Sequence, residues 1–594
     1  MNPDFRSPIS AAGAPIRFGT DGWRAIIGAD FNTANLARLT EAAARVYRED
    51  CAADAGDKPT LADDPADDLA ENLPGVSADG PTHNKPNTLI VGYDCRENAG
   101  RYAVLVGVVL ERCGFDVLIS DSYCPTPALC WSVAQNAAAV GGIMLTSSHN
   151  PAEYLGVKLR MSDGGASPKA FSDRVERALR DELPTGYETA VRFANAAKNG
   201  TPECPATLAD LTKDPTELGD LAVLAENLTL GEKRPAARAT AVLPQEKRPA
   251  ARTTVPSAPL GAPGFAYADL MTPYLAELVS LVDAPAIAAA GLEVVVDPMY
   301  GAGRHYLAQT LRDLGVTVTE IHNTDDPSFA GLHPEPILPW IQEGLDTAKQ
   351  RGACALFVTD GDADRIGAGT GQGAFVNPHL ILALLCAHLA EDKGRHGRVV
   401  RTLSGSNLVK RQCERLGLEL TTTPIGFKWI YEQMLCGDVL IGGEESGGIG
   451  IPSHVRERDG LLMALLLTEL MAQKRQTLAE LVQQLTQALG ELDYARRDLD
   501  LEPAQKDAFM TTVVAAQLDA GAYQPLFTAI GEQILNMDYR DGIKFNLSSD
   551  GWLLMRPSGT EPLVRVYAEA AGQKRLDNLL DLGSRLVQGK AQVS

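Results

Sequence analysis

Three aspartates stand at alternate positions in one short stretch of the sequence, Asp360, Asp362 and Asp364, directly after the apolar segment 354–358. Carboxylates this close repel one another and raise one another's pKa unless a cation lies between them. Ligands that are all oxygen favour a hard ion, Mg²⁺ or Ca²⁺. The spacing therefore predicts a metal site at the end of a buried strand, and the alternative is a solvated acidic turn.

An EF-hand loop also begins with aspartates at alternate positions. It requires Gly at its sixth position and Glu at its twelfth, where this chain has Arg365 and Gly371. The sequence thus excludes an EF-hand. Because Mg²⁺ in proteins usually shares its ligand shell with a phosphate oxygen, a phosphorylated group is expected nearby.

A candidate nucleophile lies in residues 146–151, which read Thr-Ser-Ser-His-Asn-Pro after the apolar run 140–145. The apolar run predicts a buried strand, and the proline and polar residues end it in a loop. Ligands of open α/β sheets usually bind at such strand ends. The same composition is also typical of an ordinary turn, and sequence alone does not choose between Ser147 and Ser148 as the reactive hydroxyl.

Two further loops carry groups that could bind a sugar phosphate. Residues 556–562 read Arg-Pro-Ser-Gly-Thr-Glu-Pro, which offers a guanidinium fork, hydroxyls and backbone N–H groups to a phosphate. Residues 443–447 read Gly-Glu-Glu-Ser-Gly, where a carboxylate could accept two neighbouring sugar hydroxyls. The alternatives are a plain hairpin turn and a plain Gly-rich turn. Lys428 and Arg24 could contact phosphate or be ordinary surface cations.

The elements that must position these loops alternate between strand and helix, which predicts α/β domains with helix-covered, mostly parallel sheets. The last hundred residues instead predict antiparallel strands with flanking helices, an α+β domain. We expect domain I at 1–190 with an acidic insertion at 51–86, a low-complexity linker at 191–262, domain II at 263–372, domain III at 373–490 and domain IV at 491–594.

The linker contains the sequence Glu-Lys-Arg-Pro-Ala-Ala-Arg twice, at 232–238 and 246–252. Two copies are too few for a solenoid, which needs at least three repeats with a buried face. The segment is predicted to be an inserted loop, with a basic docking patch as the alternative.

The composition limits the partners and the compartment. A net charge of −22 argues against nucleic acid, whose phosphates need a basic surface. No apolar run approaches the ~20 residues that span a membrane, and the N-terminus lacks the pattern of a secretion signal. The 10 cysteines form no Cys-x-x-Cys pair, so we expect reduced thiols in a cytoplasmic protein.

Together these loops resemble the motifs of the α-D-phosphohexomutase family, which includes phosphoglucomutase and phosphomannomutase. The matching stretches, in the family's order, are 18–24 (Phe-Gly-Thr-Asp-Gly-Trp-Arg), 146–151, 360–365, 443–447 and 556–562. They span the chain except for its two insertions. The resemblance implies three related α/β domains with mixed sheets and a C-terminal α+β domain around a central cleft.

The resemblance also implies a mechanism. Ser148 would carry a phosphoryl group, and one Mg²⁺ would be held by Ser148 and the three aspartates. Glucose 1,6-bisphosphate would be the bound intermediate and activator. Lys158 is the preferred acid/base, and the other residues implied in catalysis are His149, Arg24 and Arg365.

The implied substrate-binding residues are Lys428, Glu444, Ser446, Arg556, Ser558, Gly559, Thr560 and Arg565. One departure concerns residues 154–156, Tyr-Leu-Gly, where the family often has Tyr-Asn-Gly. The contact that the asparagine would make is therefore not expected here.

The resemblance favours interconversion of glucose 1-phosphate and glucose 6-phosphate by a monomer or homodimer. Phosphomannomutase and phosphopentomutase activity are alternatives with the same mechanism. From other classes, a metal-dependent sugar phosphatase would discharge the phosphoserine to water, and a sugar-phosphate sensor would need no intact nucleophile.

Overall fold

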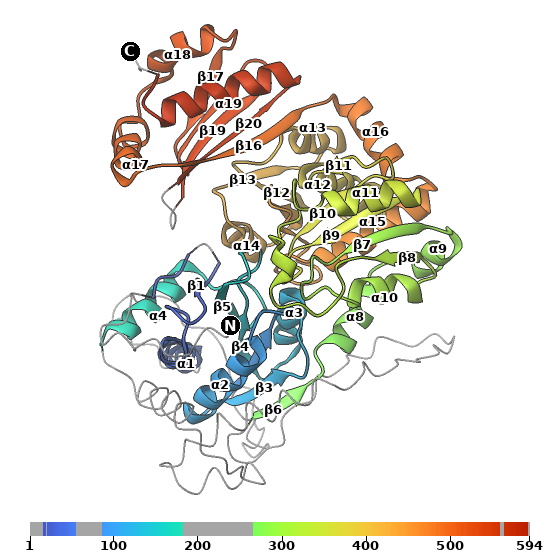
Figure 1. The fold of residues 1–594 in the computed structure, drawn as a ribbon, viewed down its shortest axis with the longest axis vertical. Coiled ribbons are helices and arrows are strands. Elements are labelled where there is room, and N and C mark those ends of the chain that lie inside the picture. The colour runs from blue at the N-terminus through green and yellow to red at the C-terminus, as the bar shows by residue number, and fades with distance from the viewer. Residues whose placement is uncertain (1–15, 20, 55–85, 182–264, 559–562, 592–594) are drawn as a thin grey trace, which may run out of the picture.

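A computed structural model describes residues 16–19, 21–54, 86–181, 265–558 and 563–591 (Figure 1). The linker at 191–262 with its two basic repeats, most of the acidic insertion, and Gly559 and Thr560 lie outside the described residues. The described residues form four sheets, and three of these sheets share one plan. A mixed α/β architecture with a separate C-terminal domain is confirmed.

The first sheet has the strand order β1-β5-β4-β2-β3-β6. Strands β2, β3, β4 and β6 are parallel, whereas β5 runs antiparallel to β4 and to β1. The strands are β1 (Trp23–Ile26), β2 (Thr88–Tyr93), β3 (Asp116–Ser120), β4 (Ala139–Leu145), β5 (Tyr154–Met161) and β6 (Phe265–Ala268). The helices are α1 (Thr33–Asp54), α2 (Ala99–Arg112), α3 (Thr126–Gln135) and α4 (Lys169–Asp181).

Two sequence expectations for this region were wrong. Strand β6 belongs to the first sheet, although 263 was expected to begin domain II, because it pairs in parallel with β3. Helix α1 continues through residues 51–54, which were expected to open the acidic insertion. Arg24 lies on strand β1, where it is paired with Gly156 of β5.

The second sheet has the order β11-β10-β9-β7-β8. Its strands are β7 (Glu293–Asp297), β8 (Thr317–Glu320), β9 (Ala355–Thr359), β10 (Ile366–Gly369) and β11 (Phe375–Val376). Helices α8 (Met271–Ser280), α9 (Ala284–Ala289), α10 (Tyr306–Asp313) and α11 (Gln342–Arg351) accompany it, with a 3-10 turn at Phe329–Gly331.

The third sheet has the order β13-β12-β14-β15. Its strands are β12 (Arg398–Thr402), β13 (Leu420–Thr423), β14 (Val439–Gly443) and β15 (Ile449–Gly450). The helices are α12 (Pro378–Ala387), which runs into a π-helical turn at His388–Asp392, α13 (Asn407–Leu416), α14 (Phe427–Leu435), α15 (Gly460–Lys474) and α16 (Leu478–Leu489).

The three sheets place their functional loops at equivalent points. In each sheet a buried parallel strand (β4, β9 or β14) turns back into an antiparallel neighbour (β5, β10 or β15). The connecting residues are 146–153, 360–365 and 444–448. Helices bury both faces of these apolar strands, so polar residues are accommodated in the loops at the strand ends and not in the strands themselves. The shared plan therefore explains why each domain contributes one candidate loop.

The fourth sheet is antiparallel, in the order β16-β20-β19-β18-β17. Its strands are β16 (Asp493–Asp500), β17 (Ile534–Asp538), β18 (Ile543–Leu547), β19 (Trp552–Pro557) and β20 (Leu563–Ala570). Helix α19 (Gln573–Val587) covers it, and α17 (Pro503–Phe509), a π-helical turn at Met510–Ala515, and α18 (Ala520–Thr528) complete the domain.

Domain IV lies beside domain III (Figure 1), and polar contacts join the two near the start of α13. Glu569 accepts a hydrogen bond from the backbone N–H of Asn407 at 2.7 Å. Asp550 pairs with Arg411 at 2.7 Å. Lys544 donates to the carbonyl oxygen of Leu403. Carboxylates near a helix N-terminus are favourable because they face unpaired N–H groups and the positive end of the helix dipole.

Candidate functional site

Residues 146–151, called the Ser148 loop below, form a strained turn whose backbone is fixed by hydrogen bonds from Arg96. Ser148 has a positive φ of 52°, which is uncommon for a residue other than glycine. Its N–H donates to Thr146 Oγ1 at 2.8 Å. The buried guanidinium of Arg96, paired with Asp94, donates to four carbonyl oxygens of this region, those of Ser148, Asn150, Pro151 and Tyr154. Arg96 thus fixes the backbone that presents the hydroxyl.

This hydroxyl meets the aspartate loop of domain II. Ser148 Oγ donates to Asp360 Oδ2 at 2.8 Å, and both side chains are buried. The two loops touch through their backbones, because a Cβ placed on Gly361 would lie 2.4 Å from the Ser148 carbonyl oxygen. Only glycine permits this approach. Of the two candidate hydroxyls, that of Ser148 is hydrogen-bonded to an aspartate, whereas that of Ser147 is buried and has no hydrogen-bond partner in the described part of the chain.

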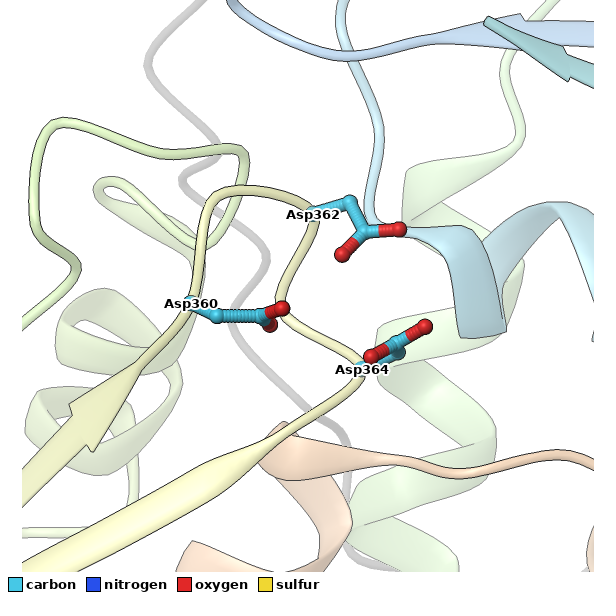
Figure 2. A group of neighbouring side chains, drawn as sticks. All are labelled: Asp360, Asp362 and Asp364. Carbon is cyan, nitrogen blue, oxygen red and sulfur yellow. The ribbon is translucent and has the colours of Figure 1, made fainter. Parts of the chain in front are cut away.

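The three aspartates are fully buried, and their carboxylates converge on one side of the loop (Figure 2). One ligand oxygen of each lies within 4.8 Å of the others. Burial and then the two neighbouring carboxylates hold the pKa of Asp360 well above its usual range. Among the described residues, the Oδ1 atoms of Asp362 and Asp364 are buried without a hydrogen-bond partner. Unpartnered buried carboxylate oxygens fit a bound cation, so this triad could hold a metal ion.

Lys158 brings domain I onto the same aspartates. It lies on β5, and its Nζ is 2.7 Å from Asp362 Oδ2 and 2.6 Å from Asp364 Oδ2. Asp21 pairs with the same ammonium at 3.0 Å. Burial opposes ionisation of Asp362, but Lys158 outweighs it and lowers the pKa of this aspartate. Thr126, at the start of α3, also donates to Asp362 Oδ2 at 2.5 Å.

Two residues of this ionic centre were missed from the sequence, Asp21 and Arg458. Arg458 comes from domain III, and its Nη2 lies 2.7 Å from Asp364 and also pairs with Asp21. One available signal for Asp21 was its place between two glycines of the 18–24 motif. The signal for Arg458 was its place in a charged run, Glu-Arg-Asp, directly before the apolar helix α15. Neither signal indicates which distant residue the charge will meet.

Backbone hydrogen bonds join the aspartate loop (360–365) to the candidate sugar loop of domain III (443–447). The N–H of Ile366 donates to the carbonyl oxygen of Gly447 at 3.0 Å, and Arg365 bridges to Gly448. Gly447 has a φ of 93°, and a Cβ there would lie 2.3 Å from the Ile366 carbonyl oxygen. The Arg365 N–H donates to Asp360 Oδ1 at 3.1 Å, and its side chain lies 3.7 Å from the buried Glu335.

Glu444 and Ser446 follow strand β14 in this loop. Glu444 is buried and lies 3.4 Å from Arg458. Burial raises the pKa of Glu444 to about 7. Ser446 is half-buried in the same turn. Glu444 is a buried carboxylate on a turn that is hydrogen-bonded to the aspartate loop, and it could accept hydrogen bonds from hydroxyl groups of a ligand.

His149 and Arg24 stand beside the Ser148 loop. His149 Nδ1 is 3.4 Å from Ser148 Oγ. Burial, followed by Arg365 and Arg24, holds the pKa of His149 well below its usual range, which keeps the imidazole neutral. Arg24 donates to Asn150 Oδ1 at 2.6 Å. Both residues therefore lie beside the Ser148 loop.

The domain IV candidates form a separate group. Arg556 and Arg565 are directly opposite each other on β19 and β20, at the base of the 556–562 loop. Ser558 is buried, and its carbonyl oxygen accepts from Lys506 at 2.7 Å. Lys428, half-buried at the start of α14, lies over the Trp429 ring. Within the described ranges, no hydrogen bond or ion pair joins Arg556 to the aspartates or to Ser148.

Comparison with known proteins identifies the family. Four domain models described as phosphoglucomutase/phosphomannomutase match this chain: domain I at 73–185, domain II at 272–373, domain III at 377–489 and the C-terminal domain at 510–582. Together they cover more than half of the chain. The chain belongs to the phosphoglucomutase/phosphomannomutase family, whose members are mutase isomerases.

Individual relatives carry different substrate names. The chain is 25% identical over 473 residues to a phosphoglucomutase of Komagataeibacter xylinus, covering 76% of this chain and 74% of the relative. It is 28% identical over 554 residues to a phosphoglucosamine mutase of a Parafrankia species, covering 93% and 94%. The open form of parafusin, a phosphoglucomutase from Paramecium, shares the fold with a TM-score of 0.69 at 19% identity, covering 98% of this chain and 97% of that one.

The helices were also compared with the length of a membrane span. None in the described part of the chain is both long and apolar enough to cross a bilayer.

Proposed function

We propose that the protein interconverts glucose 1-phosphate and glucose 6-phosphate, with a phosphoryl group carried on Ser148 and glucose 1,6-bisphosphate as the bound intermediate. The observation that supports this most strongly is the 2.8 Å hydrogen bond from Ser148 Oγ to the buried aspartate triad. A hydroxyl in contact with a hard-metal site is suited to accept and release a phosphoryl group.

The metal in this proposal is one Mg²⁺, held by Asp360, Asp362, Asp364 and an oxygen on Ser148. When bound, the ion would offset charge that develops on the transferring phosphoryl group. Arg365 and Arg24 are proposed to add positive charge at the same place, supported by their positions beside Asp360 and Asn150.

The chemical step exchanges one P–O bond for another. The bond from phosphorus to Ser148 Oγ breaks, and a bond from phosphorus to a sugar hydroxyl oxygen forms. The hydroxyl proton ends on Ser148 Oγ, and we assign Lys158 to carry it, with neutral His149 within 3.4 Å of that oxygen. Lys158 is buried beside the triad, where it can serve as acid in one direction and as base in the other.

The second phosphate of the sugar would be bound by domain IV while the first one is transferred. We propose that Glu444 and Ser446 accept or donate to sugar hydroxyls in both orientations of the intermediate. The groups proposed to bind the distal phosphate are Lys428, Arg556, Ser558, Gly559, Thr560 and Arg565. Two arginines on paired strands support this assignment, because guanidinium groups bind phosphate through two parallel hydrogen bonds.

The covalent route is tested by two neighbouring serines. Ser148→Ala is expected to remove mutase turnover, because among the described residues only the hydroxyls of Ser148 and Thr126 are hydrogen-bonded to the triad. Ser147→Ala is the matched control, since its hydroxyl has no hydrogen-bond partner, and it should keep turnover within about threefold. Near-wild-type activity of Ser148→Ala would rule out the proposal.

The sugar preference is tested separately. Glucosamine 1-phosphate is the competing substrate, because one relative, matched over 94% of its length, is named a phosphoglucosamine mutase. Measuring kcat/KM for glucose, glucosamine, mannose and ribose 1-phosphates decides it. We expect glucose 1-phosphate to be the best substrate, because the Glu-Glu-Ser loop at 444–446 resembles that of glucose-preferring members. A tenfold advantage for any other sugar would overturn this choice.

The proposal includes a cytoplasmic protein that acts as a monomer or homodimer on small sugar phosphates. The cysteines among the described residues form no disulfide, which is compatible with a reducing compartment.

A further inference from the structure

Asp541 lies in the turn between β17 and β18 of domain IV and binds two groups with one oxygen. Its Oδ2 accepts a hydrogen bond from Arg556 Nε at 2.9 Å. The same atom accepts one from the backbone N–H of Ile425 at 3.0 Å. Arg556 belongs to domain IV and Ile425 to domain III. A single carboxylate oxygen therefore ties an arginine of one domain to a loop of the other.

Both partners belong to loops with a role in the proposed function. Arg556 begins the phosphate-loop candidate at 556–562. Ile425 is three residues before Lys428, in the loop between β13 and α14. The backbone N–H that Asp541 binds is therefore in the same short segment, 424–428, as Lys428.

The geometry of the pair leaves the arginine able to bind a phosphate. Asp541 engages Nε, so it does not consume the two terminal nitrogens that form the guanidinium fork. The side chains are 14% and 21% exposed for Arg556 and Asp541, which places them at the protein surface but not free in solvent. Fixing an arginine by Nε reduces the rotamer freedom that it would otherwise lose when a ligand binds.

A second acidic residue of the same interface serves as a comparison. Asp550 also joins domain IV to domain III, through Asn407 Nδ2 at 3.2 Å and Arg411 at 2.7 Å. It touches neither Arg556 nor the 424–428 loop in the described contacts. The domain interface thus contains one acidic contact at the phosphate loop, that of Asp541, and others away from it, those of Asp550 and Glu569.

We infer that Asp541 is a positioning residue that holds Arg556 against the 424–428 loop, so that Arg556 and Lys428 form one phosphate subsite shared by domains III and IV. The inference rests on the proposed function, in which this subsite binds the phosphate that is not being transferred. Interactions of this kind are equal in the ground and transition states, so their loss raises KM and leaves kcat nearly unchanged.

The test compares Asp541→Asn with Asp550→Asn in the full-length protein. For Asp541→Asn we expect KM for glucose 1-phosphate to rise roughly tenfold, the size of one lost charge-assisted hydrogen bond, with kcat within about twofold. Calorimetric titration with inorganic phosphate should show a similar loss of affinity. Asp550→Asn, which loosens the same interface elsewhere, should leave KM and phosphate affinity unchanged.

Two results would overturn the inference. One is a KM and a phosphate affinity of Asp541→Asn within twofold of wild type. The other is an equal change in Asp550→Asn, which would show that any loosening of the interface has this effect. Absence of mutase turnover in the wild-type protein would instead reject the proposed function, and the phosphate titration would still decide on Asp541.

Discussion

Two buried lysines of this protein lie in opposite electrostatic surroundings. Lys158, at the meeting point of domains I, II and III, lies within 3.0 Å of three carboxylates, those of Asp21, Asp362 and Asp364. Lys544, at the junction of domains III and IV, donates to a carbonyl oxygen and lies 4.0 Å from the centre of the Trp552 ring.

The pKa values of the two lysines reflect these surroundings. Burial disfavours the charge of both. At Lys158 the three carboxylates outweigh burial and raise the pKa. At Lys544 burial dominates, nearby Arg401 adds to it, and the pKa falls to about 7. The comparison indicates that charges of the three-domain centre are mutually compensated, whereas those of the domain III–IV junction are only partly so.

The largest effect is expected from Lys158→Met. It leaves several buried carboxylates without their shared cation, which costs about 3–5 kcal/mol of unfolding free energy in comparable pairs. It should also lower kcat/KM by roughly 10³-fold, because the proposed proton carrier is gone. Urea unfolding and initial-rate assays measure the two effects. If Lys158→Met had the stability and turnover of the wild type, the proposed difference between the surroundings of Lys158 and Lys544 would be wrong.

A smaller effect is expected from pH at Glu444, whose pKa burial raises to about 7. The ionised form accepts sugar hydroxyls, so kcat/KM should fall as pH drops through 7, about tenfold by pH 6. Because kcat/KM reports the free enzyme, its pH profile shows this step directly. In Glu444→Gln the step should disappear and the activity should be low at all pH values. An unchanged step in the variant would assign the titration to another group.

The third effect is on stability and concerns the titration of Lys544. Its pKa is lower in the folded protein than in the unfolded chain, so the cost of its burial is fully present below pH 7. As pH rises from 7 toward 10.5, the unfolded chain binds more protons and the folded protein gains stability.

The free energy of unfolding of the wild-type protein, measured relative to that of Lys544→Met, should therefore rise by up to about 1.4 kcal/mol per pH unit in this range. Urea unfolding of both proteins at pH 7.5 and 9.5 measures the difference. A difference that is independent of pH would show that Lys544 stays charged in the folded protein, as Lys158 does.

Local sequence patterns predicted the loops of the site better than their partners. The apolar segments before residues 146, 360 and 444 indicated strands that end in polar loops, and the structure has strands there. Arg458 and Asp21 were missed because their role comes from pairing across domains, which no local pattern records. Strand β16 was missed because its residues alternate between half-buried and exposed positions and carry many charges, so no apolar face marks it.

The boundary of domain II was misplaced for a related reason. Strand β6 follows a long segment outside the described residues, and its four residues, Phe-Ala-Tyr-Ala, fit the edge of either neighbouring sheet by composition. Only its pairing with β3 assigns it to the first sheet.

The central claim is that Ser148 carries a phosphoryl group next to the compensated three-domain centre. The direct measurement is intact mass and peptide mapping after incubation with glucose 1,6-bisphosphate and Mg²⁺. We predict one added phosphoryl group on Ser148, present in wild type and Ser147→Ala and absent in Ser148→Ala. Turnover without any phosphoryl group on Ser148, or with the group on another residue, would contradict the account.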